Sequence, residues 1–207
     1  MINYSFWKRI IDIILSLLFS VIFLPIWFIV PILILLDSPG SVIYRHRRVG
    51  KDNKEFYMYK FRTMVANAEE ILFKKDKKLL EKFKKSDWKL ENDPRITKLG
   101  RLIRNLTIDE FPQLYNVLKG DMSIVGPRAY VRREIEDQTR KYPKAKKLME
   151  DILKVRPGIT GPWQTSGRNE IPFVKRAIMD SDYARNYTFW QDFGIMFKTP
   201  KAMITKW

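Results

Sequence analysis

The sequence of 207 residues contains no cysteine and a single histidine, His46. Without cysteine, the chain has no disulfide scaffold, no thiolate zinc site and no cysteine nucleophile. One histidine excludes metal sites built from several imidazoles, so any metal is expected to be a hard cation held by carboxylates. The side chains left for chemistry are therefore carboxylates, hydroxyls, lysines and arginines.

Negative charge is also scarce, because 23 aspartates and glutamates stand against 39 lysines and arginines, giving a net charge of +16. Such an excess indicates an anionic partner, which can be nucleic acid, membrane headgroups or a phosphorylated substrate. The hydrophobic fraction of 45% is ordinary for a globular protein, so a core is expected and wholesale disorder is excluded.

One long segment, from Ile13 to Leu36, has no charged residue at all. By length it can cross a hydrocarbon core of roughly 30 Å. Cationic residues flank the segment at both ends, with Lys8 and Arg9 before it, and such flanks favour the cytoplasmic face. Pro25, in the middle of the run, interrupts helical hydrogen bonding and predicts a break. We therefore expect a re-entrant helix–break–helix, and a kinked helix that spans the bilayer is the alternative.

The chain is expected to divide into this membrane-inserted hairpin, residues 1–37, and an α+β, mainly helical unit over residues 38–207. Segments 42–44 and 56–59 are rich in β-forming residues and predict a small β-hairpin. Segment 66–91 has helical spacing, and its charges are typical of a solvated helical face. An aromatic stripe at helical spacing, expected in the core or at a membrane interface, consists of Tyr183, Tyr187, Trp190 and Phe197.

Asp109 and Glu110 are the carboxylates best suited to chemistry. Adjacent helical residues point about 100° apart, so the two cannot share a proton, but they can do two different jobs at one centre. One carboxylate can attack phosphorus as a nucleophile while the other holds Mg²⁺. Thr107 and Glu110 also stand at capping-box spacing, and Asp109 is a second candidate cap ahead of Pro112. From spacing alone, capping of a helix is the simpler interpretation of the pair.

Arg104 and Arg128 flank this pair in the sequence, and a guanidinium suits bidentate binding of phosphate. Two polar, glycine-bearing loops, 156–161 and 166–169, can approach a nucleotide closely, although ordinary turns use the same residue types. No Walker loop or dinucleotide-binding fingerprint is present. His46 stands in a run of cations that is expected to face lipid headgroups rather than to take part in catalysis, namely Arg45, Arg47 and Arg48.

Taken together in order, these segments resemble the bacterial sugar transferases, or monotopic phosphoglycosyl transferases. The resemblance covers nearly the whole chain and is closest to the undecaprenyl-phosphate galactose phosphotransferase branch. The motifs that carry it are Lys8-Arg9-x-x-Asp12, Asp37-Ser38-Pro39-Gly40, Tyr59-Lys60-Phe61-Arg62-Thr63-Met64, Asn92-Asp93-Pro94-Arg95-Ile96-Thr97, Asp109-Glu110-Phe111-Pro112-Gln113-Leu114, Asn116-Val117-Leu118-Lys119-Gly120-Asp121-Met122-Ser123, Gly126-Pro127-Arg128, Val155-Arg156-Pro157-Gly158-Ile159-Thr160-Gly161 and Ser166-Gly167-Arg168-Asn169.

The resemblance implies transfer of a hexose 1-phosphate from a UDP-sugar to undecaprenyl phosphate, with release of UMP, at the cytoplasmic face of the bacterial inner membrane. It implies that Asp109 is the nucleophile, forming a covalent aspartyl-phosphosugar, and that Glu110 binds Mg²⁺. It also implies a re-entrant helix broken at proline, with Lys8, Arg9 and Pro25 as its membrane-associated residues, and interfacial amphipathic helices. The residues expected to bind substrate are Lys60, Arg104, Arg128, Asp180, Gln164, Arg168 and Asn169.

The sequence departs from the family pattern at three positions. Leu24 precedes Pro25 where small members have serine, Ala129 follows Arg128 in place of proline, and Pro162 replaces leucine. Without that serine, a helix break assisted by a hydroxyl is not expected here, and neither of the other two departures touches the expected chemistry.

The sugar is not determined by these patterns. UDP-galactose or UDP-glucose is favoured as the donor, a UDP-N-acetylhexosamine is the alternative, and the oligomeric state, including a homodimer, stays open. The non-enzymatic alternative is a membrane-tethered anion-binding protein. Headgroups, a lipid phosphate and a UDP-sugar together account for the positive charge, so no nucleic-acid partner is expected.

Overall fold

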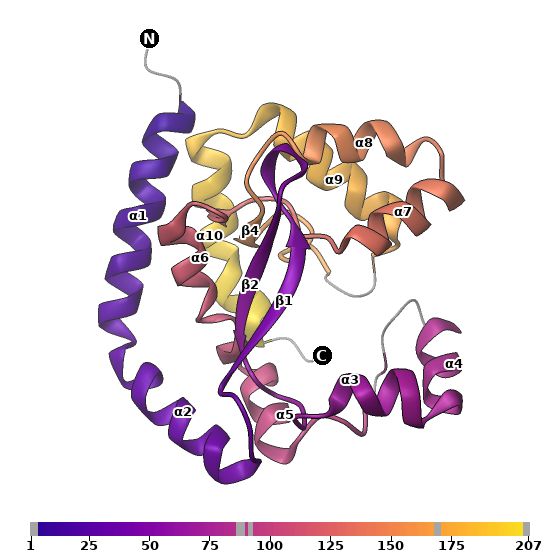
Figure 1. Cartoon of the computed structure of the whole chain (residues 1–207). Coiled ribbons are helices and arrows are strands. Elements are labelled where there is room, and N and C mark those ends of the chain that lie inside the picture. Colours follow the sequence, from indigo (N-terminus) through magenta and orange to yellow (C-terminus); the bar gives the residue numbers. More distant parts are fainter. Residues whose placement is uncertain (1–3, 86–89, 91–92, 168–170, 205–207) are drawn as a thin grey trace.

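The computed structural model describes residues 4–85, 90, 93–167 and 171–204, and it is mainly helical with a small two-stranded antiparallel sheet (Figure 1). The α-helices are α1 Tyr4–Ile22, α2 Leu24–Asp37, α3 Ala68–Glu70, α4 Lys77–Lys85, α5 Lys98–Asn105, α6 Gln113–Lys119, α7 Arg132–Lys141, α8 Ala145–Ile152, α9 Phe173–Asn186 and α10 Phe189–Ile204. The strands are β1 Ile43–Val49, β2 Glu55–Phe61, β3 Ser123–Val125 and β4 Gly158–Thr160. Short helical turns are η1 Lys51–Asn53, η2 Ile71–Lys75 and η3 Ile108–Glu110.

The apolar N-terminal segment forms the two helices α1 and α2, which are bent by 63° at the break between them. The break lies at Phe23, and Pro25 is the second residue of α2, where its missing N–H costs no helical hydrogen bond. Within the described residues, no single helix is long and apolar enough to cross a membrane, and only this bent pair passes that test together. The predicted helix–break–helix is confirmed, whereas its insertion into a membrane stays a prediction.

Helix α1 lies along α6 at one side of the molecule, and buried polar contacts fasten it there (Figure 1). The carboxylate of Asp12 accepts hydrogen bonds from the Ser123 hydroxyl at 2.8 Å and from the Ile124 amide at 2.9 Å, so it holds the start of β3. Lys8 pairs with Asp192 of α10 at 2.6 Å. The first half of the apolar hairpin is therefore joined to the rest of the fold by polar groups at its N-terminal end.

Arg9 has a separate structural role at the C-terminus of α6. Its guanidinium donates to the carbonyl oxygens of Val117 at 2.6 Å and Leu118 at 3.0 Å. The last carbonyl groups of a helix have no partner within the helix and attract positive charge. Gly120 ends α6 in the left-handed conformation with a φ of 95°, which glycine adopts readily.

The predicted β-hairpin is confirmed as β1 and β2, which pair antiparallel across the middle of the molecule (Figure 1). Asn116 of α6 binds the outer edge of β2, because its side-chain amide donates to Tyr57 O at 2.7 Å and accepts from Tyr59 N at 3.0 Å. The register places His46 opposite Met58 and Tyr44 opposite Lys60. His46 and Lys60 are therefore diagonal neighbours on one face of the hairpin.

The second strand pair, β3 with β4, is parallel and was not predicted. Its backbones approach so closely that a Cβ atom on Gly126 would lie 2.6 Å from Arg156 O and 2.7 Å from Gly158 N. The amide of Gly158 also donates to Pro127 O at 2.8 Å. This pairing fixes the backbone immediately before Arg128.

Two expectations about helices are corrected. Segment 66–91 is not one helix, because α3, the π-helical turn η2 and α4 follow one another up to Lys85, and residues 86–89 and 91 lie outside the described part.

The aromatic stripe is divided, since α9 ends at Asn186 and α10 begins at Phe189. Tyr183 is buried in the core, whereas Trp190 and Phe197 are 76% and 81% exposed.

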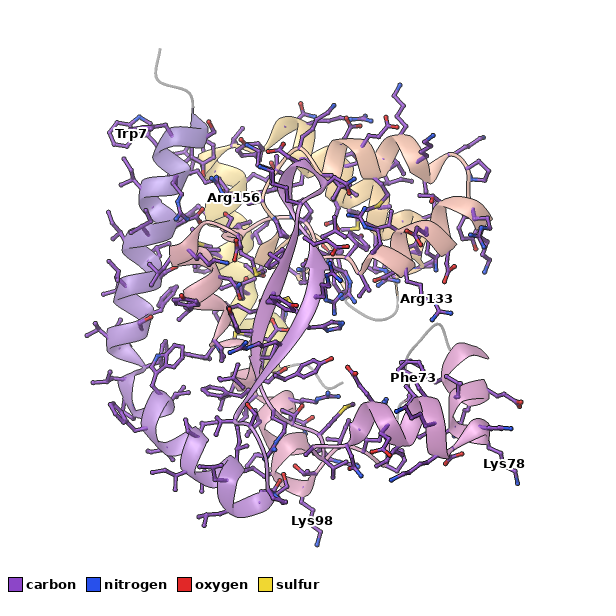
Figure 2. All side chains as sticks on the ribbon, viewed as in Figure 1. Trp7, Phe73, Lys78, Lys98, Arg133 and Arg156 are labelled. Atoms are coloured by element: carbon purple, nitrogen blue, oxygen red, sulfur yellow. The ribbon has the colours of Figure 1, made fainter. Side chains whose placement is uncertain are left out.

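Three hydrophobic clusters hold these elements together. The largest joins β2, α6, β3, α9 and α10, and Leu15 and Phe19 of α1 pack against it. A second joins α7, α8 and α9 around Tyr130. The third packs α2 against Phe61 and Ile103. Outside these clusters, labelled charged side chains such as Lys78 and Lys98 project from the periphery (Figure 2).

Candidate active site

Asp109 and Glu110 lie in the short 3-10 turn η3 between α5 and α6. The capping predictions are wrong, because Thr107 makes no capping hydrogen bond and α6 begins only at Gln113, after Pro112. Thr107 instead adopts a left-handed φ of 57°, which is rare for a β-branched residue. Such strain costs roughly 1–3 kcal/mol and is characteristic of functional turns. The chain turns sharply here and buries the Asp109 side chain.

Lys60 of β2 joins the two carboxylates. Its ammonium lies 2.7 Å from Glu110 Oε1 and 3.5 Å from Asp109 Oδ2. Burial raises the pKa of the Asp109 carboxyl; the positive charges of Lys60 and Arg104 oppose the shift, and Glu110 adds to it. Asp109 is only 6% exposed at its side chain, whereas Glu110 is 22% exposed. The pair therefore combines a desolvated carboxylate with a more accessible one.

Arg104 belongs to the same cluster through α5. Its Nε donates to the Thr63 hydroxyl at 2.8 Å, and its charge attracts Asp109. Thr97 caps α5 by accepting from Gly100 N at 2.9 Å. The structure thus brings together four of the residues predicted for the site, which are Lys60, Arg104, Asp109 and Glu110.

Arg128 and Asp180 form a second cluster after β3. Oδ2 of Asp180 accepts from the Arg128 amide at 3.1 Å and from the Tyr130 hydroxyl at 3.0 Å. Burial raises the pKa of Asp180 to about 7, against the opposing effect of these donors and of the arginine charges. Its other oxygen, Oδ1, has no hydrogen-bond partner within the described part of the chain. The guanidinium of Arg128 stacks over Trp163, with Cζ 5.3 Å from the ring centroid.

Arg176 was missed by the sequence analysis and belongs to this second cluster. Its Cζ lies 5.4 Å from the centroid of the same Trp163 ring, and its side chain is buried. Nε and Nη1 of Arg176 lack hydrogen-bond partners among the described residues. The available signal was its spacing, because Arg176 precedes Asp180 by four residues and so shares its face of α9.

His46 and Arg48 connect the two clusters, which corrects the expectation that this cationic run faces lipid headgroups. Arg48 is buried, and its Nη1 donates to Ala129 O at 2.9 Å, next to Arg128. Its Nη2 lies 3.1 Å from Nδ1 of His46. Arg45 and Arg47 are exposed, as expected. Strand alternation explains the division, because residues two apart share one face.

The other predicted substrate-binding residues are less defined. Gln164 lies beside Gly161, and its Oε1 is buried without a hydrogen-bond partner in the described ranges. Arg168 and Asn169 lie outside the described residues.

The family model described as "Bacterial sugar transferase" matches residues 3–206, nearly the whole chain. The chain belongs to the bacterial sugar transferase family.

Two relatives illustrate the extent of the match. This bacterial sugar transferase is 42% identical over 210 residues to an undecaprenyl-phosphate galactose phosphotransferase of Salmonella typhimurium, which covers 97% of this chain and 41% of the relative. It is 38% identical over 199 residues to the exopolysaccharide production protein ExoY of Sinorhizobium fredii, covering 95% of this chain and 84% of that protein. The chain thus spans about two fifths of the length of the Salmonella relative and most of the length of ExoY.

A third relative is named for a different sugar. The UDP-glucose:undecaprenyl-phosphate glucose-1-phosphate transferase of Escherichia coli is 37% identical over 200 residues, covering 93% of this chain and 39% of the relative. Relatives of similar identity therefore carry the names of different hexoses.

The donor set suits a magnesium ion. Mg²⁺ is commonly held by one or two carboxylates together with waters and substrate phosphates. The described residues contain no cluster of three or more ligand-type side chains, but Asp109 and Glu110 are adjacent, and Oδ1 of Asp109 is buried without a protein partner there. The residues of this sugar transferase thus fit a cation that also binds the substrate.

Proposed function

We propose that this chain transfers a hexose 1-phosphate from a UDP-sugar to undecaprenyl phosphate and releases UMP. The observation that carries the proposal is the desolvated Asp109 carboxylate, placed between the cations Lys60 and Arg104 and beside Glu110. A buried carboxylate that is less hydrated is a stronger nucleophile, and nearby cations offset the charge of an incoming diphosphate. The family membership and the names of the relatives support the same reaction class.

In the first step, an oxygen of Asp109 attacks the β-phosphorus of the UDP-sugar. A bond forms between this oxygen and phosphorus, and the bond from phosphorus to the bridging oxygen breaks, so UMP departs with that electron pair. Arg128 is positioned by Asp180 and Trp163 to bind the negative charge of the diphosphate. The product is an aspartyl-phosphosugar.

In the second step, a phosphate oxygen of undecaprenyl phosphate attacks the same phosphorus. The bond to Asp109 breaks, the carboxylate is regenerated and the sugar diphospholipid is released. When Mg²⁺ is bound, Glu110 is its expected protein ligand, and the ion offsets phosphate charge. The two substrates react in turn, so the proposal predicts ping-pong kinetics.

A membrane location at the cytoplasmic face is part of the proposal. Supporting it, α1 and α2 expose a broad apolar surface that includes Leu17, Val21, Phe28, Ile32 and Leu36. Helix α5 adds exposed Leu102 beside basic residues, and exposed Leu106 follows directly at its C-terminal end, which suits an interfacial helix. The cationic flanks and the bend support a re-entrant arrangement over a spanning one.

The test is a UMP-release assay with undecaprenyl phosphate, Mg²⁺ and a panel of UDP-sugars. We expect release with UDP-galactose or UDP-glucose, and release only with a UDP-N-acetylhexosamine would establish the alternative donor. Without acceptor, one equivalent of UMP and a phosphosugar adduct on the protein are expected. Failure to release UMP from any UDP-sugar, with salt-dependent anion binding retained, would instead establish the anion-binding protein.

Asp109→Asn is expected to abolish turnover and the adduct, because an amide is a poor nucleophile, while the thermal unfolding temperature stays near that of the wild type. Asp137→Asn changes an exposed carboxylate paired with Arg133 and serves as the matched control with unchanged rate. Near-normal turnover by Asp109→Asn would eliminate the nucleophile assignment.

A further inference from the structure

The only histidine of the chain lies between the two clusters of the site. His46 is a diagonal neighbour of Lys60 on one face of the hairpin β1–β2. Lys60 in turn contacts the carboxylates of Asp109 and Glu110. On its other side, Arg48 links the imidazole to the backbone of Ala129, the residue that follows Arg128. The ring also contacts that of Tyr44, with centroids 5.6 Å apart. The imidazole is only partly buried, so part of it is accessible to a ligand.

The hydrogen bond with Arg48 determines which ring nitrogen carries the proton. A guanidinium has only donors, so Nδ1 of His46, 3.1 Å from Arg48 Nη2, must be the acceptor. A neutral imidazole has one proton, which therefore resides on Nε2. No described residue accepts a hydrogen bond from Nε2, so this N–H is available as a donor.

The surroundings favour the neutral ring. The charged groups that act on His46 are Arg48, Lys60 and Arg128, and all three are cationic. Burial, followed by these charges, lowers the pKa of His46 to about 3. The ring is thus a neutral donor among cations, whereas protonation at Nδ1 would break its bond to Arg48.

We propose that the Nε2–H of neutral His46 donates a hydrogen bond to a phosphate oxygen of the substrate, between the charges of Lys60 and Arg128. A phosphate oxygen fits this position for two reasons. The surrounding cations attract an anion, and the neutral N–H donates a hydrogen bond that fixes the orientation of that anion. The inference rests on the proposed function and deepens it, because it assigns to His46 a contact with a phosphate group of that reaction's substrates. Two sources present this chemistry, the diphosphate of the UDP-sugar and the phosphate of the polyprenyl acceptor.

The first experiment observes the imidazole directly. Because the chain has one histidine, ¹⁵N-histidine labelling gives a single ring to follow by long-range ¹H–¹⁵N correlation in detergent micelles. We expect a neutral, Nε2-protonated ring from pH 8 to pH 5 without ligand, and a displaced Nε2–H signal when UDP or a short polyprenyl phosphate is added. A ring that titrates near its ordinary pKa of about 6.5, a proton on Nδ1, or no response to either probe would overturn the proposal.

The second experiment compares two variants at the same position. His46→Gln can accept from Arg48 through its oxygen and donate through its amide, so kcat/KM is expected within about threefold of the wild type. His46→Phe keeps an aromatic ring beside Tyr44 but has no donor, and we expect kcat/KM to fall about 10- to 100-fold. Equal losses in both variants, or no loss in His46→Phe, would contradict a hydrogen-bonding role.

Ping-pong kinetics separate the two phosphate sources, because each kcat/KM reports its own half-reaction. A loss confined to kcat/KM for the UDP-sugar assigns the contact to the diphosphate, and a loss confined to the acceptor assigns it to the lipid phosphate. If the wild-type chain releases no UMP, the proposed function fails, whereas the ring signal and its response to UDP or the polyprenyl phosphate still decide the inference on their own.

Discussion

Asp109 and Asp180 are two buried carboxylates whose pKa values are both raised by burial, yet their surroundings differ. Asp109 faces Lys60 and Arg104 and adjoins a second carboxylate. Asp180 accepts two hydrogen bonds at one oxygen and has an unpartnered oxygen within the described residues. The unpartnered oxygen is where a proton is accommodated, so Asp180 is suited to positioning Arg128 rather than to attacking phosphorus.

The raised pKa of Asp180 predicts how the free energy of unfolding depends on pH. Its pKa is about 7 in the folded chain, against about 3.9 when unfolded, so between these values the folded state holds a proton that the unfolded state lacks. This contribution is fully present below pH 4 and is lost as the pH rises to 7, by about 1.4 kcal/mol per pH unit. The asparagine of Asp180→Asn cannot titrate. The difference in unfolding temperature, variant minus wild type, is therefore expected to increase from pH 5 to pH 8.

Asp182→Asn is the matched control, because Asp182 is an exposed carboxylate on the same helix, α9. Its unfolding temperature should follow the wild-type curve across this pH range. If Asp180→Asn also stays parallel to the wild type, Asp180 is ionised throughout and its assignment as a protonated group is wrong.

At the scale of secondary-structure elements, the position of the site residues depends on two short strand pairs, β1–β2 and β3–β4. The hairpin β1–β2 carries Lys60, His46 and Arg48 on one face, and Asn116 of α6 fastens its outer edge. The pair β3–β4 is only three residues long on each side, but it fixes the backbone before Arg128. Two small strand pairs thus hold groups from distant parts of the sequence in one site.

Gly126→Ala tests the role of β3–β4. The added Cβ would collide with the backbone at Arg156 and Gly158, and such overpacking typically costs about 1–3 kcal/mol. We expect a lower unfolding temperature together with a reduced kcat/KM for the UDP-sugar, because Arg128 is displaced. Gly194→Ala in α10 is the control, since a Cβ there meets nothing within 4 Å and alanine favours a helix. Wild-type kinetics in Gly126→Ala would show that this pairing does not position Arg128.

The whole molecule combines an exposed apolar hairpin with a net charge of +16 (Figures 1 and 2). Lys8 and Arg9 are used internally, at Asp192 and at the end of α6, so they anchor α1 to the remainder of the fold as well as adding positive charge. On the C-terminal side of the hairpin, Arg62 donates to Pro39 O at 2.7 Å and Ser38 O at 2.5 Å. Both ends of the hairpin are therefore fastened to the same body of the protein.

This arrangement predicts that both ends of the hairpin lie on one side of the membrane. Because the chain has no cysteine, Ser5→Cys and Ser41→Cys, both at exposed positions, each introduce a single thiol. A membrane-impermeant maleimide is expected to label both in inside-out vesicles and neither in right-side-out vesicles. Lys146→Cys, on the exposed surface of α8, marks the side on which residues 38–207 lie, which the proposed function assigns to the cytoplasm. Labelling of Ser5→Cys and Ser41→Cys from opposite sides would establish a spanning helix.

Local patterns in the sequence were sufficient for several features. The charge-free run with Pro25 predicted two helices and a break, and the β-forming segments predicted the hairpin. The choice of Asp109 and Glu110 as the site carboxylates came from residue type together with the family resemblance, and their chemical roles stay a prediction. The predictions of the helix break and of the hairpin are confirmed because periodicity, proline and charge act over a few neighbouring residues.

The sequence by itself determined the apolar hairpin, the family motifs and the types of side chain available for chemistry. Only the tertiary structure decided that His46 and Arg48 face the site, that Arg176 shares Trp163 with Arg128, and that Thr107 turns the chain instead of capping a helix. These outcomes depend on contacts between residues far apart in the chain and on burial, which changes the free energy of a charge. Neither quantity is contained in the local spacing of residues.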